Sequence, residues 1–163
     1  MDALVIPSGE VPGPAAVSVE LPEGWSATPA PGVTAIALAP EIEGRFRPNI
    51  VLTHARMPAA SDLAVIAGAG RQVVEALPDF VGEPDSVVSI GGRPTIVREF
   101  AFRDTDSGLG LYQLQVQALM PVGFDLADLV TLSGTCSGSE LEFVPVLRAI
   151  ADSLRGVPDP TAA

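Results

Sequence analysis

Alternation of apolar and polar residues predicts the strands of this chain. Between residues 17 and 21, Val17, Val19 and Leu21 alternate with two polar residues. A period of two is typical of a strand whose two faces meet different surroundings. Similar runs lie at 33–39, 49–57, 86–90, 95–102, 109–120 and 129–136. In the 49–57 run both faces are partly apolar, which favours a central strand.

A change to helical spacing marks residues 61–78, where apolar residues recur every three or four positions. We expect a helix there with Ser61 as its N-cap and Pro78 at its end. Gly68 and Gly70 weaken the middle of a helix by about 1 kcal/mol each relative to Ala. Their presence therefore indicates close packing of this helix against a sheet.

A second helix is expected between residues 139 and 155. Ser139 and Glu142 have the spacing of a capping box. A start nearer Glu142 would instead place Pro145 in the first turn, where proline is tolerated. Phe143, together with the apolar residues 147, 150 and 154, forms the stripe that would face the core.

The order of these elements predicts the fold class. Three strands, a helix, four strands and a helix follow one another, and Gly-rich or Asp-rich turns at 91–94 and 104–108 connect strands as hairpins, whereas 121–128 reads as a longer loop. We therefore expect a single α+β domain, with about seven mostly antiparallel strands flanked by two main helices. Residues 1–15 are expected to be an irregular leader, 16–156 the domain and 157–163 a flexible tail.

Composition narrows the classes of partner. Among the 163 residues, 20 acidic residues outnumber 9 basic ones, which gives a formal charge of -11. Such a surface repels phosphate backbones and anionic headgroups, so nucleic acid and anionic membranes are poor partners. No run approaches the roughly 20 apolar residues of a membrane-spanning helix, so we expect no membrane insertion. The first residues lack a basic n-region, which favours a cytoplasmic location, with secretion by a non-classical route as the alternative.

Catalytic chemistry has few candidates. His54 is the only histidine and Cys136 the only cysteine, and a hydrolase would need them, or His54 and a serine, side by side. No nucleophile motif surrounds either residue, and His54 lies among apolar residues, so both are expected to be structural. The 104–108 segment begins like a calcium loop but lacks the distal glutamate, so we interpret it as a turn. We expect no cofactor and no metal.

Two rows of neutral polar residues are the most informative feature. Gln113, Gln115 and Gln117 lie on one face of the 109–120 strand, and the 129–136 strand carries a similar row that consists of Thr131, Ser133 and Thr135. If the two strands pair, amides and hydroxyls form one hydrogen-bonding surface. That surface is either an ordinary solvated face or a recognition surface, with Arg98 and Tyr112 nearby, for a peptide, protein or polar small molecule.

Four short motifs carry a resemblance to a known family. They are LPEGW at 21–25, FRPNIVL at 46–52, GGRP at 91–94 with the strand at 98–102, and IADSL at 150–154. With these, residues 16–156 resemble the LpqN-type proteins of actinobacteria, which belong to the PsbP-like and DcrB-like group of α/β/α sandwiches. The resemblance implies a seven-stranded antiparallel sheet with helices on its faces, and a group that is largely non-enzymatic. We expect no signal peptide, and the given sequence shows no lipobox cysteine, which departs from the lipoprotein members.

Together these observations favour a non-enzymatic binding or accessory protein. The expected partner is a protein or peptide, and by analogy with the group the role is chaperone-like or linked to a bacterial secretion or envelope system. A small-molecule carrier is the alternative, and a hydrolase that uses His54 and Cys136 is a weaker one.

Overall fold

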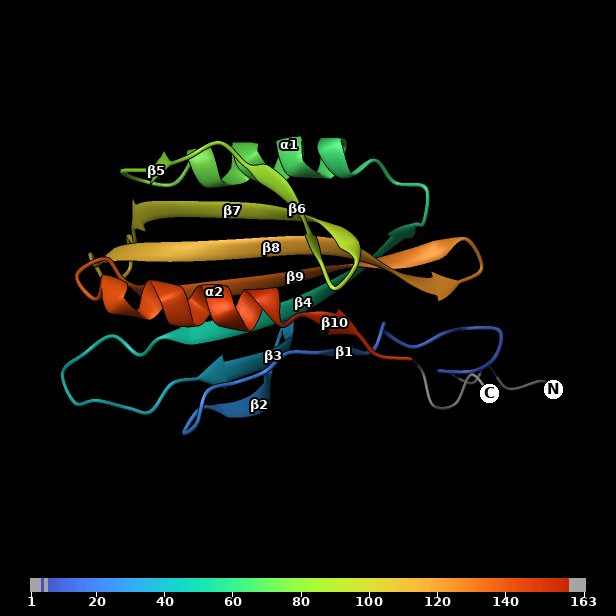
Figure 1. Ribbon diagram of the computed structural model, residues 1–163, viewed down its shortest axis with the longest axis horizontal. Coiled ribbons are helices and arrows are strands. Elements are labelled where there is room, and N and C mark those ends of the chain that lie inside the picture. Colours follow the sequence, from blue (N-terminus) through green and yellow to red (C-terminus); the bar gives the residue numbers. More distant parts are fainter. Residues whose placement is uncertain (1–3, 5, 159–163) are drawn as a thin grey trace.

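A computed structural model describes residue 4 and residues 6–158 of the chain (Figure 1). Its main element is an eight-stranded sheet in which every paired strand is antiparallel. In spatial order the sheet runs β2 (Ser26–Ala30), β3 (Val33–Leu38), β4 (Asn49–Pro58), β9 (Leu126–Ser137), β8 (Gly110–Gly123), β7 (Arg93–Arg103) and β5 (Val81–Gly82), and β6 (Ser86–Ile90) also pairs with β7. A separate pair joins β1 (Val17–Ser18) to β10 (Arg155–Gly156).

Two helices lie on opposite faces of this sheet. They are α1 (Leu63–Glu75) and α2 (Val144–Asp152), and a short 3-10 turn, η1 (Leu141–Phe143), precedes α2. In β7, Arg98 donates a hydrogen bond to the Ala67 carbonyl of α1, whereas the next residue, Glu99, pairs with Arg148 of α2. Adjacent strand residues point to opposite faces. Figure 1 shows α2 along the middle of the sheet and α1 beside the β7 edge.

The apolar core lies between α2 and the sheet. Leu114 and Val116 of β8 and Leu132 of β9 are fully buried there, together with Leu147 and Ile150 of α2. The approach of α2 is close: a Cβ on Gly134 would lie 3.0 Å from Ile50 Cδ1 and 3.1 Å from Leu147 Cδ2. A larger residue at this position of β9 would require the side chains of Ile50 and Leu147 to shift by a few tenths of an ångström. Within residues 6–158, no helix has the length and apolar character needed to cross a membrane.

The expected antiparallel sheet and both helices are confirmed, whereas the number of strands is wrong. The sheet has eight strands where about seven were expected, and a two-stranded sheet is added. The strands that sequence reasoning missed are β2, β5 and β10. Two of these contain only two residues, too few to show a period, and β2 contains Pro29 and small residues that have low strand propensity. In the 17–21 run only Val17 and Ser18 form a strand.

Two element boundaries also differ from expectation. The supposed loop at 121–128 is a tight turn, because β8 continues to Gly123 and β9 begins at Leu126. Phe124 and Asp125 make this turn with φ angles of 55° and 56°. Left-handed residues other than glycine are uncommon, so the alternation gives no sign of it.

The helix caps differ as well. Asp62, and not Ser61, caps α1, because its carboxylate accepts a hydrogen bond from the Ala64 amide, while the Ser61 hydroxyl donates to the Pro58 carbonyl. No capping box forms before α2, and Ser139 bonds to Ser137 instead. Pro145 lies in the first turn of α2, as expected.

The leader is tied to the sheet at its C-terminal end. Arg56 donates to the carbonyl oxygens of Pro12 and Gly13, and the Ala15 amide donates to Asp128. Residues 6–16 contain no helix or strand. Part of the predicted leader, residues 1–3 and 5, and most of the predicted tail, residues 159–163, lie outside the described residues.

Candidate functional site

The two polar rows meet, because β8 and β9 pair in the register that brings them together. Gln113 lies opposite Thr135, Gln115 opposite Ser133 and Gln117 opposite Thr131. The row continues across the sheet on the same face: Ser133 lies opposite Val51 of β4, Val51 opposite Ile36 of β3, and Ile36 opposite Thr28 of β2. The sequence prediction of one joint polar surface is therefore confirmed as a matter of geometry.

This surface carries no charged side chain on five strands. We call it the uncharged face, and it consists of Ser26, Thr28, Ile36, Leu38, Asn49, Val51, Thr53, Ala55, Gln113, Gln115, Gln117, Leu129, Thr131, Ser133 and Thr135. Most of these side chains are half-buried or exposed. The chain as a whole has a net charge of -11, so the absence of Asp, Glu and Arg from these positions sets this face apart from the average composition of the chain.

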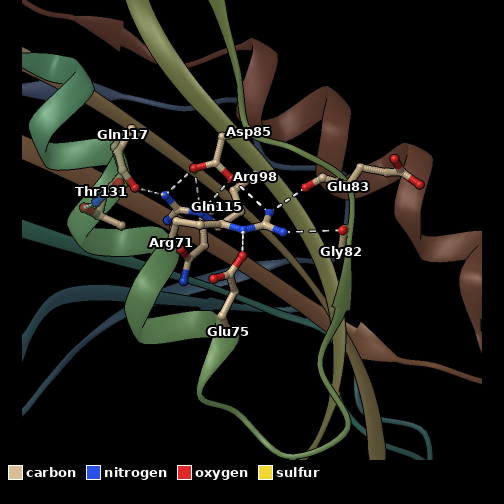
Figure 2. Close-up of polar contacts among 10 residues, drawn as sticks. Arg71, Glu75, Gly82, Glu83, Asp85, Arg98, Gln115, Gln117 and Thr131 are labelled. Atoms are coloured by element: carbon tan, nitrogen blue, oxygen red, sulfur yellow. Dashed lines mark hydrogen bonds and ion pairs between the residues drawn. The ribbon is translucent and has the colours of Figure 1, made fainter.

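Arg98 of β7 lies at the edge of the uncharged face, opposite Gln115. Its side chain is only 1 % exposed, and Asp85 neutralises it through an ion pair of 2.6 Å between Nη2 and Oδ2. Arg71 of α1 approaches the same carboxylate, with 3.3 Å between Nη1 and Oδ1, and also pairs with Glu75. Figure 2 shows the two guanidinium groups converging on Asp85. The edge is thus electrically balanced by two arginines and two carboxylates.

A directed relay of hydrogen bonds runs from Arg98 into the face. Arg98 Nη1 donates to Gln115 Oε1 at 3.0 Å, Gln115 Nε2 donates to Gln113 Oε1 at 3.0 Å, and Gln113 Nε2 donates to Thr135 Oγ1 at 2.9 Å. Because each group is held by the next, the amides have fixed orientations. The face therefore presents a pre-organised pattern of donors and acceptors.

Gln117 stands apart from this relay. Its Nε2 donates to Thr131 Oγ1 at 3.1 Å, whereas its Oε1 is buried and has no hydrogen-bond partner among the described residues. An unpaired buried acceptor costs about 1–3 kcal/mol. This is the one place on the uncharged face where a buried polar atom is left unpaired in the part of the chain that the structure describes.

Helix α1 packs against Arg98 through Gly70. A Cβ on Gly70 would lie 2.8 Å from Arg98 Nη1, so any larger residue would meet the guanidinium. The predicted close packing at the helix glycines is therefore confirmed for Gly70. It is wrong for Gly68, where an added Cβ would meet nothing within 4 Å.

The cover that α1 provides stops near the β7 edge (Figure 1). Val51 and Thr53 of β4 and Ile36 of β3 stay half-buried on the open part of the face. The outer side of α1 is also apolar, since Val65 is 68 % exposed and Val73 is 70 % exposed.

Tyr112 does not belong to this site. It lies opposite Cys136, one position out of phase with Gln113, so it points to the α2 face of the sheet. The expectation that Tyr112 lies near the polar rows is therefore wrong, and the reason is the strict two-residue period of β8. Burial raises the pKa of Tyr112.

His54 and Cys136 are both structural in their contacts. The imidazole of His54 bonds to Thr34 Oγ1 and to the Ala15 carbonyl, each at 2.9 Å. Cys136 is fully buried, and burial raises the pKa of its thiol to about 11. His54 lies opposite Val130, six residues from Cys136 along β9, which corresponds to roughly 20 Å at 3.3 Å per residue. The two side chains cannot form a catalytic dyad.

The turn at 104–108 is closed by its own groups. The Asp104 carboxylate accepts hydrogen bonds from the Ser107 amide and hydroxyl, and the hydroxyl bond lowers the pKa of this carboxyl below its usual value. Within the described residues, no three His, Cys, Asp or Glu side chains gather as a metal-binding group. The interpretation as a hairpin turn between β7 and β8 is confirmed.

Sequence reasoning missed Asp85 and Arg71, which hold Arg98 in place. Asp85 lies in the short link between β5 and β6, after Pro84, where a carboxylate has no distinguishing neighbours. Arg71 lies in the helical run at 61–78, whose pattern does not set it apart from other polar helix residues. Only the folded arrangement brings these two residues to a buried guanidinium.

Comparison with solved structures identifies the fold. The chain is similar to LpqN of Mycobacterium tuberculosis, described as involved in cell envelope biogenesis, with a TM-score of 0.75 and 16% identity over 92% of this chain and 88% of LpqN. It is also similar to CyanoP, the PsbP of the cyanobacterium Synechocystis sp. PCC 6803 (TM-score 0.58, 10% identity, 89% of this chain and 95% of CyanoP). A third structure is PA94 of Pseudomonas aeruginosa, a protein of unknown function (TM-score 0.53, 17% identity, 91% of this chain and 99% of PA94).

Sequence comparisons add no closer relative: no family model and no curated protein matches the chain. At identities of 10% to 17% the structural likeness concerns the fold and leaves the activity open. The antiparallel sheet and the two helices agree with that likeness over nearly the whole described domain. The chain has the LpqN-like and PsbP-like fold.

Proposed function

We propose that this chain is a non-enzymatic binding protein that holds a protein or peptide partner against the uncharged face. The observation that carries the proposal is the absence of charged side chains from that face on β2, β3, β4, β8 and β9. A face that serves only solubility would carry some of the 29 ionisable acidic and basic residues of this chain. The partner is a segment rich in apolar and neutral polar residues, since charges would lose hydration there without finding a counter-charge.

Pre-organisation supports the same function. The relay from Arg98 through Gln115 and Gln113 to Thr135 fixes the amide orientations before a partner arrives. Less side-chain entropy is then lost on binding. Half-buried Val51 and Ile36 provide apolar area beside these amides. This mixture of apolar contact and fixed hydrogen-bonding groups is typical of protein interfaces.

The two alternatives have weaker support. A carrier of drug-sized molecules needs a cavity of about 300–1,000 Å³. Two cavities in the described residues each have a volume of about 180 Å³. A hydrolase that uses His54 and Cys136 would need them in contact, and both are engaged or buried elsewhere.

The cellular role that we propose rests only on the similarity of the fold to that of LpqN. LpqN is described as involved in cell envelope biogenesis. We therefore place the binding activity in a chaperone-like or accessory role for a bacterial envelope or secretion system, by analogy.

The test introduces charge into the open part of the face. Thr53→Glu and Ser133→Glu change half-buried side chains on neighbouring strands, and their negative charges oppose an apolar partner. The experiment is affinity capture from the native host followed by quantitative mass spectrometry. In the variants, the captured amount of at least one partner is expected to fall about tenfold or more relative to wild type. The matched control is Thr105→Glu, in the exposed turn between β7 and β8.

Circular dichroism and the melting temperature establish that each variant is folded. If the folded single variants Thr53→Glu and Ser133→Glu each capture the same proteins in the same amounts as Thr105→Glu, the uncharged face is not the binding surface. Loss of the same partners in Thr105→Glu as well would also contradict the proposal, because the effect would then follow net charge and not position.

A further inference from the structure

One of these cavities lies away from the uncharged face, at one end of the sheet. It is enclosed by the connection between β3 and β4, residues 39–48, and by the turn that leads into α2 (Figure 1). Its apolar lining consists of Ala39, Pro40, Ile42, Phe46, Pro48 and Phe143, and its volume is about 180 Å³. Ile42 is 51 % exposed, so the cavity reaches the surface of the molecule. We call it the loop pocket.

The size of the loop pocket fits one large apolar side chain. A dry cavity of about 150 Å³ holds a benzene ring, whereas drug-sized ligands need about 300 Å³ or more. Leu141, which is 55 % exposed beside Phe143, extends the apolar surface outside the opening. An occupant would thus bury one side chain in the pocket and rest its neighbours on the rim.

Acidic residues adjoin the pocket: Glu140 lines it, and three further glutamates are sequence neighbours of the lining residues Ile42 and Phe143, so we count them as its rim. Glu41 and Glu43 are exposed on either side of Ile42, and Glu140 and Glu142 precede Phe143. Two guanidinium groups accompany these four carboxylates, and both are engaged. Arg45 Nη1 pairs with Glu140 Oε1 at 3.0 Å, and Arg47 Nε donates to the Ala39 carbonyl at 2.6 Å.

The excess of negative charge acts on neighbouring groups. Burial is the first cause of the raised pKa of Cys136, and the carboxylates of Glu140 and Glu142 add to it. With the chain's net charge of -11, the rim attracts cations from a distance and speeds the encounter with a basic partner.

We propose that the loop pocket is a docking site for a basic peptide segment of a partner protein, which inserts one Phe-sized or Leu-sized side chain and places Lys or Arg on the rim. The pocket selects the apolar side chain by volume, and Glu41, Glu43 and Glu142 select its positively charged neighbours. The site differs in chemistry from the uncharged face, which carries no charge and which the function proposed above assigns to a neutral segment.

The probe is the blocked peptide acetyl-Arg-Lys-Phe-Lys-Arg-amide, titrated to about 2 mM into the isotopically labelled chain at low salt and followed by NMR. We expect saturable shifts confined to the residues around the loop pocket. Replacing Phe by Ala in the peptide is expected to weaken binding at least about tenfold, because burial of a phenylalanine side chain contributes more than the 1.4 kcal/mol that corresponds to a factor of ten.

The matched variants separate the rim from net charge. Glu41→Gln with Glu43→Gln is expected to weaken binding about threefold to tenfold and to flatten its salt dependence. Glu83→Gln with Asp106→Asn changes the net charge equally at exposed positions elsewhere and is expected to change binding less than twofold. Ile42→Asp, at an exposed position, is expected to abolish binding while the NMR spectrum of the rest of the chain is retained.

Four results would overturn the proposal. They are the absence of saturable shifts at 2 mM peptide, equal binding of the Phe and Ala peptides, equal binding of a peptide with Glu in place of Lys and Arg, and binding of phenethylamine as tight as that of the peptide, which would make this a site for a small cation. Peptide binding by the Thr53→Glu and Ser133→Glu variants is expected to be unchanged. The failure of one site is therefore distinguishable from the failure of the other.

Discussion

The two faces of the sheet differ although the same strands build both. On β9, Leu132 points into the α2 face and is fully buried, while its neighbour Ser133 points to the uncharged face and is half-buried. On β8, Val116 and Gln117 divide in the same way. The difference teaches that alternate residues of one strand can serve two purposes: one set supplies the free energy of folding, and the other supplies a surface of fixed composition.

The energies of the two faces differ accordingly. Burial of an aliphatic side chain on the α2 face contributes about 1.5–3 kcal/mol. A hydrogen bond on the uncharged face contributes about 0.5–1.5 kcal/mol net, because water would satisfy the same groups in the unfolded chain. Substitutions on the uncharged face are therefore expected to be tolerated where those on the α2 face are not.

The largest expected effect comes from neighbouring residues of β9. Leu132→Ala is expected to lower the free energy of unfolding by about 3 kcal/mol, because it leaves a cavity in the core, where Leu132 is 0 % exposed. Ser133→Ala is expected to change it by less than about 0.5 kcal/mol. Urea denaturation of both variants gives the comparison, and losses of similar size would mean that the uncharged face also carries the stability of the fold.

A second test concerns the buried charge at the edge between the faces. Asp85→Ala leaves the guanidinium of Arg98 buried without its carboxylate and is expected to cost about 3 kcal/mol. Adding Arg98→Met is expected to restore much of this loss, since it removes the unpaired charge. The control is Asp79→Ala, which breaks an exposed pair with Arg103 and is expected to cost less than about 1 kcal/mol. Thermal or urea denaturation measures all four chains, and a double variant less stable than Asp85→Ala would contradict this account.

Substitutions at the two glycines of α1 are expected to change the stability of the fold by smaller amounts and in opposite directions. Gly68→Ala is expected to stabilise the fold by up to about 1 kcal/mol, because the new methyl group meets nothing within 4 Å and alanine favours the helix. Gly70→Ala places the methyl group 2.8 Å from Arg98 Nη1 and is expected to destabilise it. The two melting temperatures should move in opposite directions. If both melting temperatures rise, α1 and Arg98 leave room for a methyl group at residue 70, and the close contact is contradicted.

The smallest effect is a dependence on pH on the α2 face. The hydrogen bond from Arg148 holds the pKa of Glu99 below its ordinary value of 4.5. A carboxyl with a lowered folded-state pKa stabilises the fold above its unfolded pKa, and this contribution disappears as the pH falls through the folded value. Between pH 7 and pH 3, wild type is therefore expected to lose up to about 1 kcal/mol more than Glu99→Gln, since Arg148 is half exposed. Equal losses in urea titrations at the two pH values would rule this out.

The alternation of apolar and polar residues predicted those strands that are long enough to show several repeats of it. The alternation at 49–57 and 109–120 placed β4 and β8 to within three residues at either end. It could not show β5 or β10, whose two residues are ordered by their neighbours. The turn at Phe124 and Asp125 was missed because its left-handed conformation is set by the pairing of β8 with β9.

The candidate site divides in the same way. The rows of Gln113, Gln115 and Gln117 were visible because side-chain direction in a strand follows from position alone. The same rule excluded Tyr112, which was grouped with them by nearness in sequence. Asp85 could not be found, since its approach to Arg98 depends on how the β5–β6 link crosses the sheet. Local periodicity carries no information on such long-range pairs.

The strand order has a consequence for folding of this chain during its synthesis on the ribosome. β4 pairs with β9, which is about seventy residues later in the sequence, and β1 pairs with β10 near the other end. Until β9 emerges, β4 is an unpaired edge with apolar residues on both of its faces, which is a template for aggregation. Contacts between such distant segments also slow folding. The exposed edge of β4 is therefore covered only after β9 and the segments that follow it have been synthesised.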